Sequence, residues 1–298
     1  MSIRYLQRPQ IDPIKWNESV LKSRIPQAYA LFDYLDKITN NQWSALVYGD
    51  YEAVFPLPMK EKFGIRYVVQ PVFCQQLGGF GSNENVSTMD FVKAIPKRFL
   101  RVRLNLNPYF DKQTKLPLDT KTNFLLSLSS QPEYNKDCKK NLLGLQKHPI
   151  QYEENKISIR EAINVYREAW GDTNQRLTTN DYERFENACE TLQALHGGVL
   201  TISATHTETN ELLGAAILLR LRNLQDEQTQ LLQYVCAGPT AAGKTLGIMH
   251  GIIDTAIQKH LGPNTVFDFE GSSIASVAAF YKKFGPTDNP YYVLKQGL

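Results

Sequence analysis

The sequence predicts a mixed α/β protein with two domains. Helix-like and strand-like hydrophobic patterns alternate along the chain, and the order helix, helix, hairpin, strand, helix, strand occurs twice. The length of 298 residues suits two domains, since a typical domain has about 150 residues. We therefore expect one domain over residues 1–130 and a second over residues 131–298.

The first domain is expected to contain three helices and several strands. The pair Gly49-Asp50 lies between two runs rich in β-forming residues and marks a hairpin turn. Helices are expected at 11–22, 27–38 and 88–95, a hairpin at 43–58, and strands at 65–71 and 99–105.

The second domain is expected to repeat this order. Thr178-Thr179-Asn180 offers N-cap chemistry for its second helix, and Gly197-Gly198 offers a C-cap. Helices are expected at 157–170, 181–196, 246–260 and 273–284, a hairpin at 199–221, and strands at 228–237, 265–270 and 291–295. One more short strand is expected at 122–128, in the polar junction between the two domains.

Cysteine use and hydropathy predict a cytoplasmic protein without a metal site. The four cysteines lie far apart, form no C-x-x-C pair and are expected to be reduced thiols. No apolar run approaches the roughly 20 residues that a membrane-spanning helix needs. The N-terminal segment has no features of a secretory signal, so we expect neither a membrane span nor export. The cysteines are Cys74, Cys138, Cys189 and Cys236.

Residues 238–245 match the phosphate-binding pattern G-x-x-x-x-G-K-[ST] at every fixed position. In a nucleoside triphosphatase, Lys244 would contact the terminal phosphates and Thr245 would contact Mg²⁺. The chain after this segment contains too few strands for such a fold, so we do not expect nucleotide hydrolysis. Gly238 and Gly243 can instead form a turn that binds the pyrophosphate of coenzyme A, or one that only redirects the backbone.

Several segments of the sequence resemble those of a known family. They are residues 70–80, 267–272 and 277–285, and the Gly-containing segment 237–244 between an expected strand and the helix that follows it. The second half resembles the GNAT superfamily of acyl-CoA N-acyltransferases. The whole chain is similar to Fem-type (FemAB-like) bacterial proteins, which pair two GNAT-like domains. The resemblance implies tandem α/β (α+β) domains, each with a mixed, mostly antiparallel sheet flanked by helices.

The resemblance also implies an acyl or aminoacyl transferase. Its donor would be an acyl-CoA or an aminoacyl-tRNA, and its acceptor an amine of a small polar or cell-envelope molecule such as a peptidoglycan precursor. In GNAT proteins the substrates react where the third strand separates from the strand that follows the loop helix. In this sequence the two corresponding strands are expected at about 229–236 and 265–270. Backbone amides near Val235 and Cys236 are expected to polarise the donor carbonyl. The expected phosphate-holding residues are Gly238, Gly243, Lys244 and Thr245.

Asp268 and Glu270 are the expected catalytic carboxylates. They lie two residues apart on one predicted strand and so share a face, with Phe267 and Phe269 on the other. A partly buried carboxylate has a raised pKa and can act as a base; alternatively, one of the pair caps a helix or forms an ion pair. Tyr281 either protonates the leaving group or is a core aromatic.

Gln70, Gln75 and Gln76 form a cluster of amides in an apolar setting. Each amide offers a donor and an acceptor, so the cluster either binds a polar substrate or satisfies loop backbone groups. The densest basic stretch either contacts tRNA phosphates or is a solvated face. Its residues are Lys93, Lys97, Arg98, Arg101 and Arg103.

Two other functions stay open. Segment 237–244 does not match the family's Q/R-x-x-G-x-G/A pattern, which favours a GNAT-shaped binding protein without catalysis. A P-loop nucleotide-binding protein is the third alternative, and it would require Mg²⁺-dependent nucleotide binding that depends on Lys244.

Overall fold

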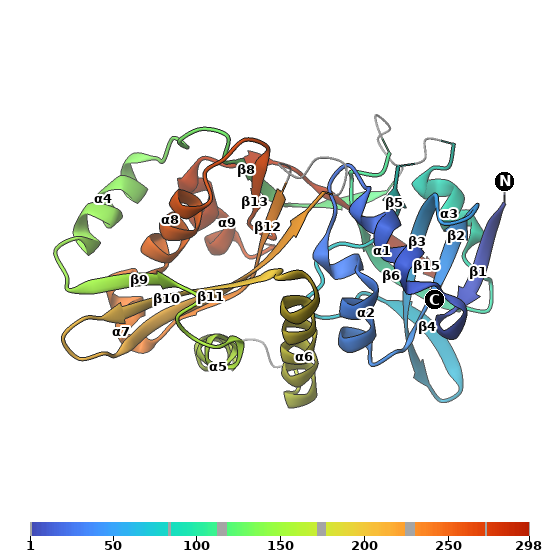
Figure 1. Cartoon of the computed structure of the whole chain (residues 1–298), viewed down its shortest axis with the longest axis horizontal. Coiled ribbons are helices and arrows are strands. Elements are labelled where there is room, and N and C mark those ends of the chain that lie inside the picture. The colour runs from blue at the N-terminus through green and yellow to red at the C-terminus, as the bar shows by residue number, and fades with distance from the viewer. Residues whose placement is uncertain are drawn as a thin grey trace. The chain divides into compact units, whose positions relative to one another are not determined.

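The computed structural model describes residues 2–82, 85–111, 118–171, 177–223, 230–271 and 273–297. The chain forms two compact α/β units, and Figure 1 labels most of their elements. Unit 1 comprises residues 1–122, 221–227 and 290–298, and unit 2 comprises residues 123–220 and 228–289. The predicted fold class is confirmed, since each unit has a mixed sheet flanked by helices.

Unit 1 is built on a sheet with the strand order β1-β2-β3-β4-β6-β15-β7, and β5 pairs with β3. Strands β3 and β4 form an antiparallel hairpin, whereas β4 and β6 run parallel. The strands are β1 (Ile3–Gln7), β2 (Trp43–Tyr48), β3 (Ala53–Lys62), β4 (Ile65–Val69), β5 (Phe80–Gly81), β6 (Arg101–Leu106), β7 (Asp119–Lys121) and β15 (Tyr291–Gly297). The helices are α1 (Pro13–Leu21), α2 (Phe32–Thr39) and α3 (Thr88–Ala94), with short 3-10 turns at Arg8–Gln10 and Ala28–Ala30.

Aromatic side chains fill both faces of this sheet. The ring of Trp16, on α1, meets that of Trp43, on β2, edge-on at 4.9 Å. On the opposite face, Phe91 of α3 stacks on Phe55 of β3 at 5.4 Å. Asp12 caps α1 by accepting hydrogen bonds from two backbone amides of its first turn. The unit therefore buries large aromatic surface, which is the main stabilising contribution to such a core.

Unit 2 has a second sheet with the order β14-β8-β13-β12-β11-β10-β9. Strands β12 and β13 run parallel, whereas the pairs β9–β10, β10–β11, β8–β13 and β8–β14 are antiparallel. Figure 1 shows α4, α8 and α9 on one side of the sheet and α5 and α6 on the other. The strands are β8 (Phe124–Ser127), β9 (Ile150–Glu154), β10 (Val199–His206), β11 (Leu212–Arg222), β12 (Gln230–Pro239), β13 (Thr265–Asp268) and β14 (Thr287–Asp288). The helices are α4 (Lys136–Leu145), α5 (Ile159–Trp170), α6 (Thr179–His196), α7 (Ala241–Leu246), α8 (Met249–Lys259) and α9 (Ala275–Tyr281), followed by a 3-10 turn at Lys282–Phe284.

Local signals set the helix ends in unit 2. Thr178 caps α6 in a capping box with Asp181, and Gly197 ends it with a left-handed φ of 57°, as predicted. The helix expected at 246–260 is divided, because Gly247 turns the chain at a φ of 73° between α7 and α8. The strand expected at 265–270 ends at Asp268. Residues 228 and 229 of another expected strand lie outside the described residues.

The last strand joins the first sheet. The sequence predicts a strand at 291–295, and β15 forms there between β6 and β7. Lys295 lies opposite Arg103 in the antiparallel register, and Arg103 Nη1 donates a hydrogen bond to Gln296 O at 3.0 Å. Unit 1 therefore contains backbone from both halves of the sequence.

Candidate active site at the separation of two parallel strands

The two parallel strands of unit 2 separate part-way along their length. β13 pairs with β12 only through the register Gln230–Gln233 with Thr265–Asp268. β12 then continues to Pro239, so residues 234–239 extend beyond the paired segment. This separation lies where the sequence places the transfer reaction.

The side chains of β12 change their alternation just past the paired segment. Tyr234 and Ala237 both pack against the core that includes α8, although strict alternation would put them on opposite faces. Cys236 lies instead near Cys189 of α6. Burial, and then the electrostatic effect of Cys189, raise the pKa of the Cys236 thiol well above its usual value. The half-buried Val235 lies at this change, where the sequence places the carbonyl-polarising amides.

Asp268 ends β13 and has no exposed surface. Burial raises the pKa of its carboxyl to about 7, opposed by the Glu270 N–H and by the nearby Asn123 side chain. The Glu270 N–H donates to Asp268 Oδ1 at 2.8 Å. Oδ2 accepts no hydrogen bond of ordinary length within the described part of the chain. Asp268 is therefore poised to hold a proton near neutral pH, but it does not face solvent.

Glu270 is half-buried and lies in a turn rather than on the strand. Its φ of 59° is left-handed, so the strand geometry that would put it on one face with Asp268 stops before it. Gln233 Nε2 donates to Glu270 Oε1 at 3.2 Å, and Gln233 is also the register partner of Asp268. The two carboxylates are thus neighbours around Gln233, which sequence reasoning missed although it is an amide inside the apolar run of β12.

Tyr281, at the end of α9, lies beside this group. Burial, and then the negative charge of Glu270, raise the pKa of its phenol above the usual range. Its ring meets those of Tyr234 at 6.2 Å and Phe269 at 5.1 Å. The three predicted catalytic residues, Asp268, Glu270 and Tyr281, therefore occupy one region of unit 2.

The segment 238–245, which matches the phosphate-binding pattern, connects β12 to α7. The Gly243 N–H donates to Thr240 Oγ1 at 3.2 Å, so the cap of the same helix uses this amide. A Cβ on Gly243 would lie 1.8 Å from Leu213 O, and one on Gly238 would lie 2.8 Å from the Ala169 Cβ. Both glycines therefore permit close packing that a larger side chain would prevent.

The two other fixed positions of the motif differ in their contacts. The Thr245 hydroxyl donates to Ala241 O at 3.2 Å, one turn back in α7. Lys244 is exposed. The mostly antiparallel sheet around the segment does not support the nucleoside triphosphatase interpretation, because that fold needs further parallel strands.

Metal and membrane features are absent from the parts of the chain that can be described. Within those ranges, no group of three or more His, Cys, Asp or Glu side chains could hold a metal ion. The four cysteines are free and buried. No helix in the same ranges is both long and apolar enough to cross a bilayer. Ser272, in a run that carries the family likeness, lies outside the described residues.

Comparison with known proteins decides the fold. No protein-family profile matches the sequence, and no curated protein matches it. The crystal structure of FemX is similar with a TM-score of 0.64 and 12% identity, over 99% of this chain and 98% of that one. A conserved protein of unknown function from Bacteroides thetaiotaomicron VPI-5482 is similar with a TM-score of 0.58 and 9% identity, over 99% of both chains.

The chain has a Fem-type double-GNAT fold. In this Fem-type fold each unit contributes one parallel strand pair that follows a hairpin, β4 with β6 in unit 1 and β12 with β13 in unit 2. The two pairs are equivalent in element order.

In unit 1 of the Fem-type fold, the chain itself fills the equivalent place. Leu77 donates its N–H to Asn105 O at 2.8 Å and accepts from the Asn107 N–H at 2.6 Å. Gln70 Oε1 accepts from the Asn105 N–H at 3.0 Å, and Asn105 Nδ2 donates to Gln75 O at 2.8 Å. The loop after β4 is thereby bound to β6.

The predicted glutamine cluster belongs to this loop. Gln70 Nε2 donates to Cys74 O at 2.8 Å, and Gln76 Nε2 donates to Gln75 Oε1. Gln76 is buried, whereas Gln70 and Gln75 are half-buried. All three side-chain amides therefore have at least one partner within the loop or β6. The buried Gln76 Oε1 accepts no hydrogen bond from the described residues.

Proposed function

We propose that this protein transfers an acyl or aminoacyl group to an amine at the separation of β12 and β13 in unit 2. The observation that carries the proposal is the contrast between the two equivalent strand pairs. In unit 1, loop residues such as Leu77 bond across to β6. In unit 2, the same place holds Glu270 and Tyr281, whose side chains can accept and donate a proton, and Gln233, whose amide donates to Glu270.

Glu270 is proposed as the general base. Its carboxylate takes a proton from the attacking amine as the new bond between nitrogen and the acyl carbon forms. The bond from that carbon to the leaving sulfur or oxygen then breaks, and the Tyr281 hydroxyl donates a proton to the leaving atom. The raised pKa of Tyr281 keeps this phenol protonated at neutral pH, which supports the role of proton donor.

Asp268 and Gln233 are proposed as positioning residues. Asp268 accepts the Glu270 N–H and so holds the left-handed turn that presents the Glu270 side chain. Gln233 donates to that side chain and fixes its orientation. Backbone amides at Val235 and Cys236 are proposed to stabilise the negative charge that develops on the carbonyl oxygen.

The donor is proposed to be an activated acyl compound, either an acyl-CoA or an aminoacyl-tRNA. For a phosphate-bearing donor, Lys244 and Thr245 are the proposed contacts, because both are exposed. The acceptor is proposed to be an amine of a small polar molecule or of a cell-envelope precursor of the peptidoglycan type.

The test is a transfer assay with the full chain. Acetyl-CoA and alanyl-tRNA are offered separately, with a muramyl pentapeptide precursor as acceptor, and both kcat and KM are measured. Glu270→Gln keeps the acceptor atom for Gln233 but removes the base, so kcat should fall about 100-fold or more. Tyr281→Phe should lower kcat less if the leaving group is a thiolate, because a thiolate leaves more readily without a proton.

Glu183→Gln is the matched control, because Glu183 is an exposed carboxylate on α6. It should leave kcat unchanged. Full activity in Glu270→Gln would exclude this residue as the base. Binding of a donor without any transfer would instead favour a GNAT-shaped binding protein, an alternative supported by the complete burial of Asp268. Transfer from only one donor decides between the two donor classes.

A further inference from the structure

The turn between β3 and β4 carries a residue that does not suit it. Lys62 pairs with Ile65 across the hairpin, which leaves Phe63 and Gly64 as a two-residue turn with φ values of 54° and 74°. Two left-handed residues define a type I′ turn, whose first position favours asparagine, aspartate or glycine. A phenylalanine in this conformation is strained. The Phe63 side chain is also 90% exposed, so neither the backbone nor packing accounts for it.

Two further apolar side chains lie at the same end of the sheet. Ile65, the first residue of β4, is 48% exposed. Leu100 is 56% exposed and directly precedes β6. Because β6 runs parallel to β4 with Val68 opposite Val102, both strands begin at this end, and Leu100 lies level with Arg66. Figure 1 shows the β3–β4 hairpin extending past the rest of the sheet.

Basic side chains surround these apolar ones. The Lys62 ammonium lies 5.3 Å from the centroid of the Phe63 ring, an exposed contact that either group can release. Arg66 and Arg101 are exposed, and Arg66 also pairs with Glu61 at 2.9 Å. We call the group of Phe63, Ile65, Leu100, Lys62, Arg66 and Arg101 the tip patch.

We propose that the tip patch docks the protein on an anionic lipid surface. A projecting turn with an exposed aromatic and aliphatic side chains can enter the boundary between headgroups and acyl chains. The basic residues around it are attracted to anionic headgroups. The positive charge alone would also suit RNA. Ile65 and Leu100, however, form no hydrogen bonds or ion pairs with a nucleotide, whereas burying their apolar side chains among acyl chains is energetically favourable. This docking is independent of the proposed transfer chemistry.

The test is co-sedimentation of the full chain with vesicles. The protein should bind phosphatidylcholine vesicles that contain phosphatidylglycerol, and bind pure phosphatidylcholine vesicles much more weakly. Phe63→Asn should weaken binding about tenfold or more, because a buried phenyl ring is lost. The same change puts a favoured residue into the turn, so the thermal midpoint should stay the same or rise. Lys62→Gln should weaken binding about fivefold and lower its salt dependence.

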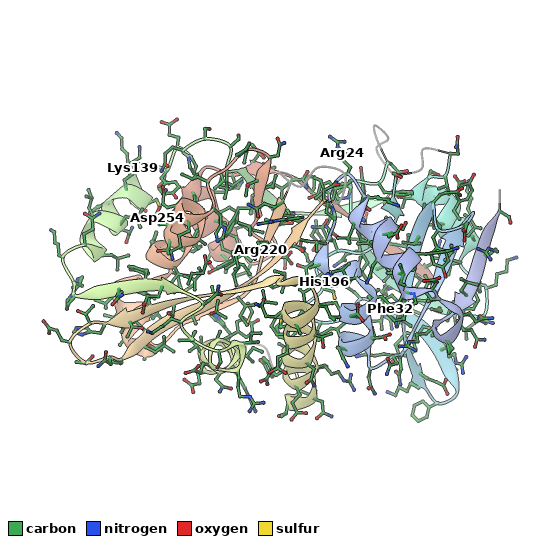
Figure 2. The ribbon with its side chains drawn as sticks, viewed as in Figure 1. Arg24, Phe32, Lys139, His196, Arg220 and Asp254 are labelled. Carbon is green, nitrogen blue, oxygen red and sulfur yellow. The ribbon has the colours of Figure 1, made fainter. Side chains whose placement is uncertain are left out.

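A matched control is available in unit 2. Leu143 on α4 is 61% exposed, and Lys139, which Figure 2 labels, lies on the same helix. Leu143→Gln should leave vesicle binding unchanged. The proposal is overturned if Phe63→Asn binds anionic vesicles as the unmodified protein does, if both vesicle types bind equally, or if the protein binds a single-stranded RNA but neither vesicle. In Phe63→Trp, a blue shift of fluorescence on vesicle addition would support insertion of the turn, and an unchanged spectrum would oppose it.

Discussion

Replacing Asp268 with asparagine removes a buried carboxyl group and tests its environment directly. The pKa of this group in the folded protein is about 7, compared with an ordinary value of 3.8. Because the folded pKa is raised, folding takes up a proton between these two values. The stabilisation is therefore fully present below about pH 4, falls as pH rises, and is lost above about pH 7.

The size of the effect follows from the shift. A carboxyl group that gains a proton on folding changes the free energy of unfolding by about 1.4 kcal/mol per pH unit between its two pKa values. Asp268 has no exposed surface, so solvent screening does not reduce this figure. Between pH 5 and pH 8 the unmodified protein should lose about 2–3 kcal/mol through this group. Asp268→Asn lacks this loss, although its side-chain oxygen can still accept the Glu270 N–H.

The assay is urea unfolding followed by circular dichroism at several pH values from 5 to 8. The difference between the two proteins should grow steadily towards pH 5, in favour of the unmodified chain. Parallel profiles for Asp268→Asn and the unmodified chain would refute the reasoning that burial raises the pKa of Asp268.

Two further predictions concern stability in unit 2, and both are checked by the free energy of unfolding in urea. Gly243→Ala should lower the free energy of unfolding by about 2–3 kcal/mol, because the new Cβ would clash with Leu213 O. Gly144→Ala, at an open position on α4, should instead raise it by about 0.5–1 kcal/mol. Equal effects of these two changes would contradict the packing argument. Tyr134→Phe should cost about 1–2 kcal/mol, because the Tyr134 hydroxyl donates to Asp254 Oδ1 at 2.9 Å, on α8 in Figure 2. An unchanged stability would mean that water replaces this bond without loss.

Most helices and the hairpins β2–β3 and β10–β11 were predictable because their signals are local, whereas α4 and the separate helix α7 were not predicted. The N-cap at Thr178, the C-cap at Gly197 and the turn at Gly49 are each encoded within a few residues. The sequence did not predict β1 or β9, whose side chains lack a clear apolar alternation. Their pairing with a neighbouring strand stabilises them, and that partner is distant in sequence.

The candidate site was predictable only in part, for a similar reason. Asp268 and Glu270 were found because they are carboxylates on an apolar run, but the left-handed φ of Glu270 depends on the Asp268 carboxyl that accepts its amide. Gln233 lies 37 residues before Glu270. Only the parallel pairing of β12 with β13 brings them together, and no spacing within either segment indicates it.

The position of β15 constrains the order in which the protein can fold during synthesis. Strands β6 and β7 flank a place in the sheet that stays empty until residues 291–297 have left the ribosome. Unit 2 needs residues only up to 289, so all of its strands are available first. The earlier-made unit 1 must therefore wait as an incomplete sheet with exposed edges, a state open to chaperones and to aggregation.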